Sequence, residues 1–80
     1  MGAMKTVEID CRELMEELLL EDLDENVLGR NLWCWLGAVK HYRDLAANSQ
    51  DLANQKYFIE EGKWREDRAI ETIFEMQHLC

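Results

Sequence analysis

Hydrophobic residues recur every three or four positions near the start of the chain, which is the spacing of one face of an α-helix. The pattern runs from about Cys11 to Asp22, and its members are Cys11, Leu14, Met15, Leu18 and Leu19. Asp10 precedes the pattern as a candidate N-cap, and Glu13 stands three positions later, as in a capping box. A helix is therefore predicted over 11–22, with this apolar face in the core.

The longest hydrophobic pattern follows directly. Asp24 is placed as an N-cap, and a helix is predicted from there to about Ala47, before the polar break at 48–51. Five of its residues are spaced four, three, four and three apart, which is an a/d pattern. We call them the seam and expect them in the core: Leu28, Leu32, Trp35, Val39 and Tyr42. Val27 and Cys34 widen the seam on one side, and Leu36 widens it on the other. Cys34 is expected to be buried as a small hydrophobe.

Trp33 does not belong to that seam. At 100° per residue it lies about 140° from Leu28, close to Gly37 and Lys40 on the polar side of the helix. Gly29 and Gly37 flank the indole at a spacing of four residues, which would leave room for another helix. Trp33, Gly37 and Lys40 are therefore predicted to form an oligomer or partner interface.

The last third of the chain has two interpretations. We favour a short helix over 51–61 that ends with Gly62 as its C-cap, followed by a helix from about Lys63 to His78. The alternative is a β-hairpin over 56–66 with Glu61–Gly62 at its turn. In the final helix one face is shared by Ala69, Ile70, Ile73, Phe74 and Gln77.

These elements predict an all-α fold, a small bundle of three to four helices. Eighty residues are enough for one domain, and proline is absent. We expect residues 1–3 to be an expression remnant that precedes a single helical domain over 4–80. Val7 and Ile9 alternate with polar residues, so a short strand or an extended segment is expected before the first helix.

The net charge of −8 is confined to one segment. Nine acidic residues and one base, Arg12, lie between Glu8 and Glu25, whereas the rest of the chain has eight of each sign. Such a segment repels nucleic acid and anionic membranes, so we expect neither as a direct partner. The longest apolar run, Leu32 to Val39, is also far shorter than the ~20 residues of a membrane span. A protein with a basic surface is the expected partner.

Little in the sequence indicates chemistry. Cys34 and His41 lie seven residues apart, but close cysteine or histidine pairs of the kind that bind zinc are missing. The three cysteines have no paired spacing, which favours reduced thiols and a cytoplasmic location. We therefore expect no catalytic residues, no metal, no cofactor and no enzymatic activity.

Two functional hypotheses remain beside a solvated acidic surface with no binding role. In the first, the protein is a small acidic inhibitor or adaptor that engages a basic surface of a nucleic-acid-handling protein through Glu13, Glu16, Glu17, Glu21 and Asp24. In size and charge, although in no motif, it is similar to compact acidic proteins of phages and mobile elements, such as anti-CRISPR proteins and other DNA mimics. In the second, the protein is a structural homo-oligomer, with the aromatic helix as the interface and the acidic segment serving solubility. A homodimer is expected in either case.

Overall fold

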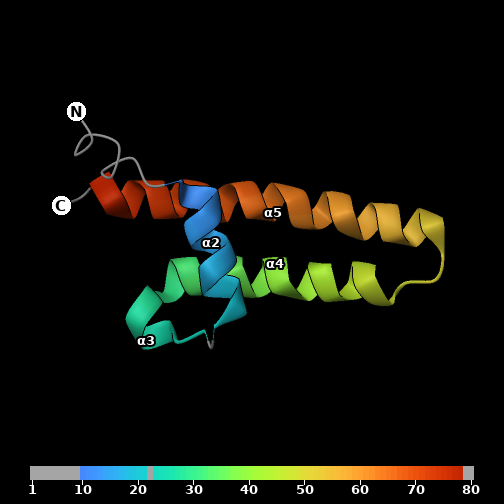
Figure 1. Ribbon diagram of the computed structural model, residues 1–80, viewed down its shortest axis with the longest axis horizontal. Helices are drawn as coiled ribbons and strands as arrows, with labels where there is room; N and C mark the ends of the chain where they lie inside the picture. Colours follow the sequence, from blue (N-terminus) through green and yellow to red (C-terminus); the bar gives the residue numbers. More distant parts are fainter. Residues whose placement is uncertain (1–9, 22, 79–80) are drawn as a thin grey trace.

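The computed structural model describes residues 10–21 and 23–78, and within them it contains four α-helices and no strand (Figure 1). The helices are α2 (Cys11–Leu20), α3 (Glu25–Leu28), α4 (Arg30–Asn48) and α5 (Leu52–His78). The prediction of a small all-α bundle is confirmed. The expectations for residues 1–9, including Val7 and Ile9, lie outside the described residues.

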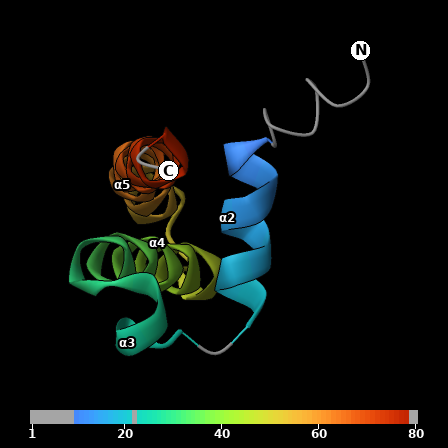
Figure 2. The ribbon, with the colours of Figure 1, turned by 90° about the vertical axis from the view of Figure 1, so that its left-hand side faces the viewer.

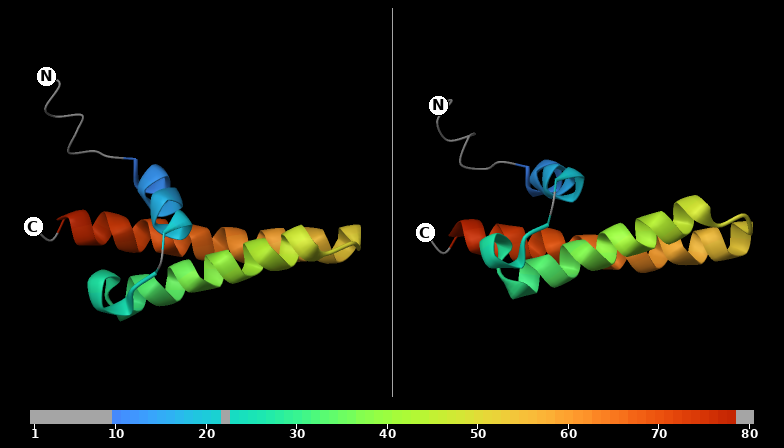
Figure 3. Two further views of the ribbon diagram at one scale, coloured as in Figure 1. Left: turned by 60° about the horizontal axis from the view of Figure 1, so that its bottom comes forward. Right: turned by 90° about the horizontal axis from the view of Figure 1, so that it is seen from below.

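The long helices α4 and α5 run antiparallel, side by side, and are joined by the short turn 49–51 (Figure 1). We call this pair the helical hairpin. The short helix α2 lies across one face of the helical hairpin and reaches both of its helices (Figure 2). Figure 3 shows that α2 covers only the part of the helical hairpin that is farther from the turn. We call residues 40–63, which include the turn, the hairpin tip, and residues 30–39 and 64–78 the hairpin base.

Side chains begin the helices where the sequence indicates. The Asp10 carboxylate accepts the Arg12 N–H at 3.0 Å, and the Asp24 carboxylate accepts the Asn26 N–H at 2.9 Å, so both predicted N-caps are confirmed. The helix that begins after Asp24 is interrupted, however, after one turn. Gly29 has φ +84° and ψ 152°, a conformation that is open only to glycine, and α4 begins after it.

The core lies where α2, α4 and α5 meet. Its buried residues are Met15, Leu19, Leu32, Leu36, Val39, Ala69 and Ile73. The predicted core face of α2 is therefore confirmed, and so are Leu32 and Val39 of the predicted seam. Leu28, Trp35 and Tyr42 are only half-buried. Helix α4 packs against α5 on one side and α2 on another, which moves the centre of its buried face toward Leu36.

Two expected core residues are exposed instead. Cys34 lies two positions from both Leu32 and Leu36, and two residues correspond to about 200° of helix rotation, so its side chain points away from the core. Val27 is 77% exposed because it belongs to α3, which Gly29 separates from the register of α4. The predictions that Cys34 is buried and that Val27 widens the seam are wrong.

Helix α5 is continuous through Gly62, so the predicted break there and the alternative β-hairpin over 56–66 are both wrong. Gly62 is buried, and a Cβ atom at this position would lie 3.1 Å from the Tyr42 Cβ. The glycine therefore permits the close approach of α4 and does not end a helix. Farther along α5, Ala69 and Ile73 are buried as their shared face predicts, but Phe74 is 54% exposed.

Candidate functional site

The acidic residues of α2 occupy two different environments. Glu13 and Glu17 of α2 and Glu21 at its C-cap are exposed and follow one another at four-residue intervals, and the two within the helix lie about 6 Å apart along its axis. Met15 and Leu19, on the other side of α2, are buried. We call these three glutamates the acidic ridge. Among the described residues none of the three forms an ion pair, so their charges face solvent.

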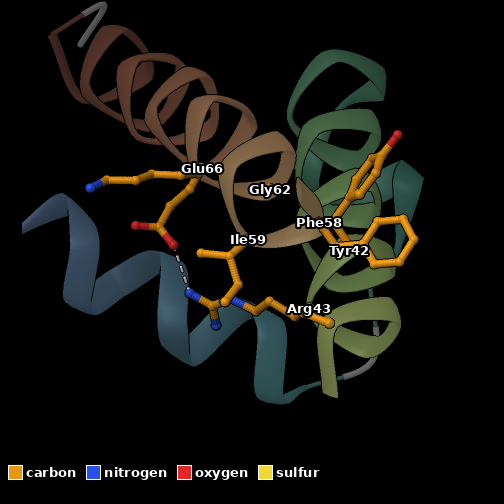
Figure 4. Close-up of a pocket in the computed structure, with 8 residues that line it drawn as sticks. Tyr42, Arg43, Phe58, Ile59, Gly62 and Glu66 are labelled. Atoms are coloured by element: carbon orange, nitrogen blue, oxygen red, sulfur yellow. Dashed lines mark hydrogen bonds and ion pairs between the residues drawn. The ribbon is translucent and has the colours of Figure 1, made fainter. Parts of the chain in front are cut away.

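Glu16, by contrast, is half-buried and is held by a residue of another helix. Its carboxylate accepts two hydrogen bonds from the Arg43 guanidinium of α4, at 2.9 and 2.6 Å. Arg43 also donates to Glu66 of α5 at 2.8 Å, a bond drawn in Figure 4, and Glu66 accepts a further hydrogen bond from Arg12 of α2. Alternating charges thus join α2, α4 and α5.

The ion network shifts the pKa values of two of its members. The hydrogen bond from Arg43 lowers the pKa of Glu16 below its ordinary value, and the positive charges of Arg43 and Arg12 act in the same direction against the opposing effect of burial. The hydrogen bond to Glu16 in turn raises the pKa of Arg43. The Glu16–Arg43 pair is therefore fully charged at neutral pH, and it attaches α2 to α4.

Two of the five predicted acidic binding residues thus have structural roles. Glu16 is an internal ion-pair partner, and Asp24 caps α3 although it remains exposed. The sequence pattern gave no partner for Glu16, because Arg43 is 27 residues away. One signal was available: Arg43 lies four residues after buried Val39, and Glu66 lies seven before buried Ile73. Charged residues at such positions lie beside the buried face, where they can reach partners on a neighbouring helix.

The predicted interface on α4 lies apart from the core. Trp33 is half-buried, Lys40 is exposed, and no atom lies within 4 Å of a Cβ built on Gly37. Gly29, which was expected to flank Trp33 within the same helix, lies at the break before α4. This edge of α4 therefore has space beside Gly37 but only one large apolar side chain.

An aromatic cluster on the helical hairpin was not anticipated. Trp35 of α4 and Trp64 of α5 meet edge to face, with ring centroids 5.9 Å apart. The Arg65 guanidinium lies 4.3 Å from the ring centroids of both Tyr42 and Trp64. Such cation–π and aromatic contacts stabilise the pairing of α4 with α5. They also explain why Trp35 and Tyr42 are only half-buried, since they pack along the edge of the helix pair.

The remaining polar chemistry is sparse. Within residues 10–21 and 23–78, no group of three or more His, Cys, Asp or Glu side chains could hold a metal ion. Cys11 and Cys34 are free thiols, and Cys34 and His41 are both exposed. None of the described helices is both long enough and apolar enough to span a bilayer. Comparisons with protein-family models, with curated proteins and with solved structures found no match.

Proposed function

We propose that this protein is a non-enzymatic binding module whose acidic ridge engages a basic surface of another protein, in particular one that handles nucleic acid. The observation that supports this proposal is the division of the α2 carboxylates. Glu16 is paired with Arg43 of α4, whereas Glu13, Glu17 and Glu21 remain exposed and without an ion pair among the described residues.

A row of fixed negative charges suits this task for a physical reason. Proteins that bind nucleic acid carry Lys and Arg side chains that neutralise successive phosphates. Carboxylates about 6 Å apart on a rigid helix present a comparable line of negative charge. Complementary charges of this kind accelerate association and are screened by salt beyond about 10 Å at 0.1 M ionic strength. Binding through the acidic ridge is therefore expected to weaken steeply as salt rises.

The test begins with capture of partners from the native host and their identification by mass spectrometry. Purified partner is then titrated with the wild-type protein and with the triple variant Glu13→Lys, Glu17→Lys, Glu21→Lys. We expect the triple variant to lose binding and to stay folded, because these side chains are outside the core and repel one another within α2. Duplex DNA or RNA should compete with the wild-type protein for the partner.

The matched control reverses three exposed glutamates of α5, in the variant Glu60→Lys, Glu71→Lys, Glu75→Lys. It makes the same change in net charge at a different place. Retained binding by this control, together with loss in the α2 variant, supports recognition by the acidic ridge. Equal losses in both would show that only total charge matters, and full affinity of the α2 variant would overturn the proposal.

A further inference from the structure

One apolar stripe on α5 is covered at one end and bare at the other. Leu52, Ile59, Glu66 and Ile73 are spaced seven residues apart and so lie on one face of the helix. At the hairpin base, Ile73 is buried and Glu66 is bound by Arg12 of α2. At the hairpin tip, Ile59 is 54% exposed and Leu52 is 80% exposed. The stripe therefore continues beyond the cover that α2 provides.

A hollow of about 290 Å³ lies beside Ile59, between the two helices of the hairpin tip. Tyr42 and Phe58 lie at one side of it, and Ile59 and Arg43 lie at the other (Figure 4). Its volume is several times the ~30 Å³ that one water molecule occupies in the liquid, so the hollow has room for a side chain. Ala46 and Gly62, which also line it, are small residues that leave this space open.

A surface on which an apolar side chain projects next to an apolar hollow can pair with the same surface of a second copy. If a two-fold axis passes close to Ile59, the isoleucine of each copy enters the hollow of the other. Such an isologous contact between two antiparallel helix pairs forms a four-helix bundle, in which the two tips supply the layer that each lacks alone.

The distribution of charge also suits a second copy. The hairpin tip has four acidic and four basic residues, so two tips do not repel each other despite the net charge of −8. Helix α2 meets α5 at Glu66, which Arg12 binds, and Glu66 lies seven residues from Ile59, or about 10 Å along α5. The antiparallel arrangement would therefore place the two acidic α2 helices about 20 Å apart along the bundle, beyond the ~10 Å screening length at 0.1 M salt.

We infer that the hairpin tip is a self-association surface, on which a second copy of this chain packs with Ile59 at the two-fold axis. This inference does not rest on the proposed function, because the acidic ridge and the hairpin tip are separate surfaces. The dimer would also display two acidic ridges, one on each side of the two-fold axis.

The test is the molar mass in solution, measured by sedimentation equilibrium or light scattering up to high micromolar concentration. The wild-type protein should approach twice its chain mass of 9.5 kDa. Ile59→Lys should give the chain mass at every concentration, because two lysine charges would face each other in an apolar contact. The conservative variant Ile59→Val should remain dimeric.

The matched control is Tyr57→Lys on the same helix. Tyr57 is 55% exposed, almost the same fraction as Ile59. The two residues are two positions apart, which corresponds to about 200° of helix rotation, so Tyr57 lies on the opposite side of α5. Its variant should remain dimeric. Far-UV circular dichroism should show all three variants folded, since both positions are already about half exposed; if Ile59→Lys unfolds, the smaller change Ile59→Ser serves instead.

Three outcomes would overturn the inference. The first is a wild-type protein of monomer mass over the whole concentration range. The second is a dimer that survives Ile59→Lys, and its dissociation in Tyr57→Lys would then place the interface on the opposite side of the tip. The third is a dimer broken by Trp33→Lys alone, which would place the interface at the edge of α4 with Trp33, Gly37 and Lys40.

Discussion

The base and the tip of the helical hairpin are built from the same two helices but differ in how many layers they have. At the base, α2 adds a third layer, and residues such as Leu36 and Ala69 reach zero exposure. At the tip, α2 reaches only Arg43, α4 and α5 pair alone beyond it, and Leu52 and Ile59 remain largely in solvent. The difference shows that the apolar stripe of a helix does not make a core by itself. In this fold the contiguous buried cluster forms only where a third element covers the groove between the two helices.

This comparison predicts very different costs for the same substitution at the two ends. Leu36→Ala should lower the free energy of unfolding by about 2–5 kcal/mol, because it empties a site without solvent exposure. Leu52→Ala should change it by less than about 0.5 kcal/mol, because this side chain is 80% exposed. Urea unfolding followed by circular dichroism measures both.

The measurement is to be made at low micromolar concentration, where a dimer contact at the tip contributes least to stability. A Leu52→Ala cost close to that of Leu36→Ala under these conditions would contradict the division between base and tip.

Two glycines allow a second comparison with smaller effects. Gly62→Ala should destabilise by about 1 kcal/mol, because the new methyl group meets the Tyr42 Cβ at 3.1 Å and the cost of overpacking exceeds the gain in helix propensity. Gly37→Ala should stabilise by about 0.5–1 kcal/mol, because the position is within α4 and nothing lies within 4 Å.

Thermal unfolding of the two variants beside the wild type gives the signs. Stabilisation by Gly62→Ala would mean that α4 and α5 separate easily at the tip. Destabilisation by Gly37→Ala would mean that another chain occupies the predicted interface on α4.

Local patterns were sufficient to predict the features that depend on neighbouring residues. The three-and-four spacing of α2 gave its buried face, and the carboxylates of Asp10 and Asp24 marked two helix starts. The acidic ridge could also be predicted, since the exposure of Glu13 and Glu17 follows from the position of the apolar face opposite.

Features that depend on distant residues could not be predicted in this way. Gly62 has the local signature of a helix end, and its actual role depends on Tyr42, twenty residues earlier in another helix. The same limit applies to Glu16, whose pairing with Arg43 turns an apparent surface carboxylate into an attachment point for α2. The exposure of Cys34 could not be predicted from α4 alone, because the side of α4 that α2 covers decides which of its residues are buried.

The smallest predicted effect concerns the link between α2 and the helical hairpin. The pKa of Glu16 is lowered in the folded state, so its bond to Arg43 contributes stability above the ordinary glutamate pKa of about 4.3, and this stability is lost as the pH falls through the lowered value. Both side chains are more than two-fifths exposed, so solvent screens the pair, and we expect a coupling energy of about 0.5 kcal/mol. A double-mutant cycle of Glu16→Gln and Arg43→Gln at pH 7 measures this coupling. The contribution of the Glu66–Arg43 bond cancels in the cycle. Repeating the cycle at successively lower pH should bring the coupling toward zero once Glu16 is protonated, because the neutral side chain no longer attracts Arg43. A coupling that persists unchanged in acid would show that shape and hydrogen bonding, without charge, hold α2 on the helical hairpin.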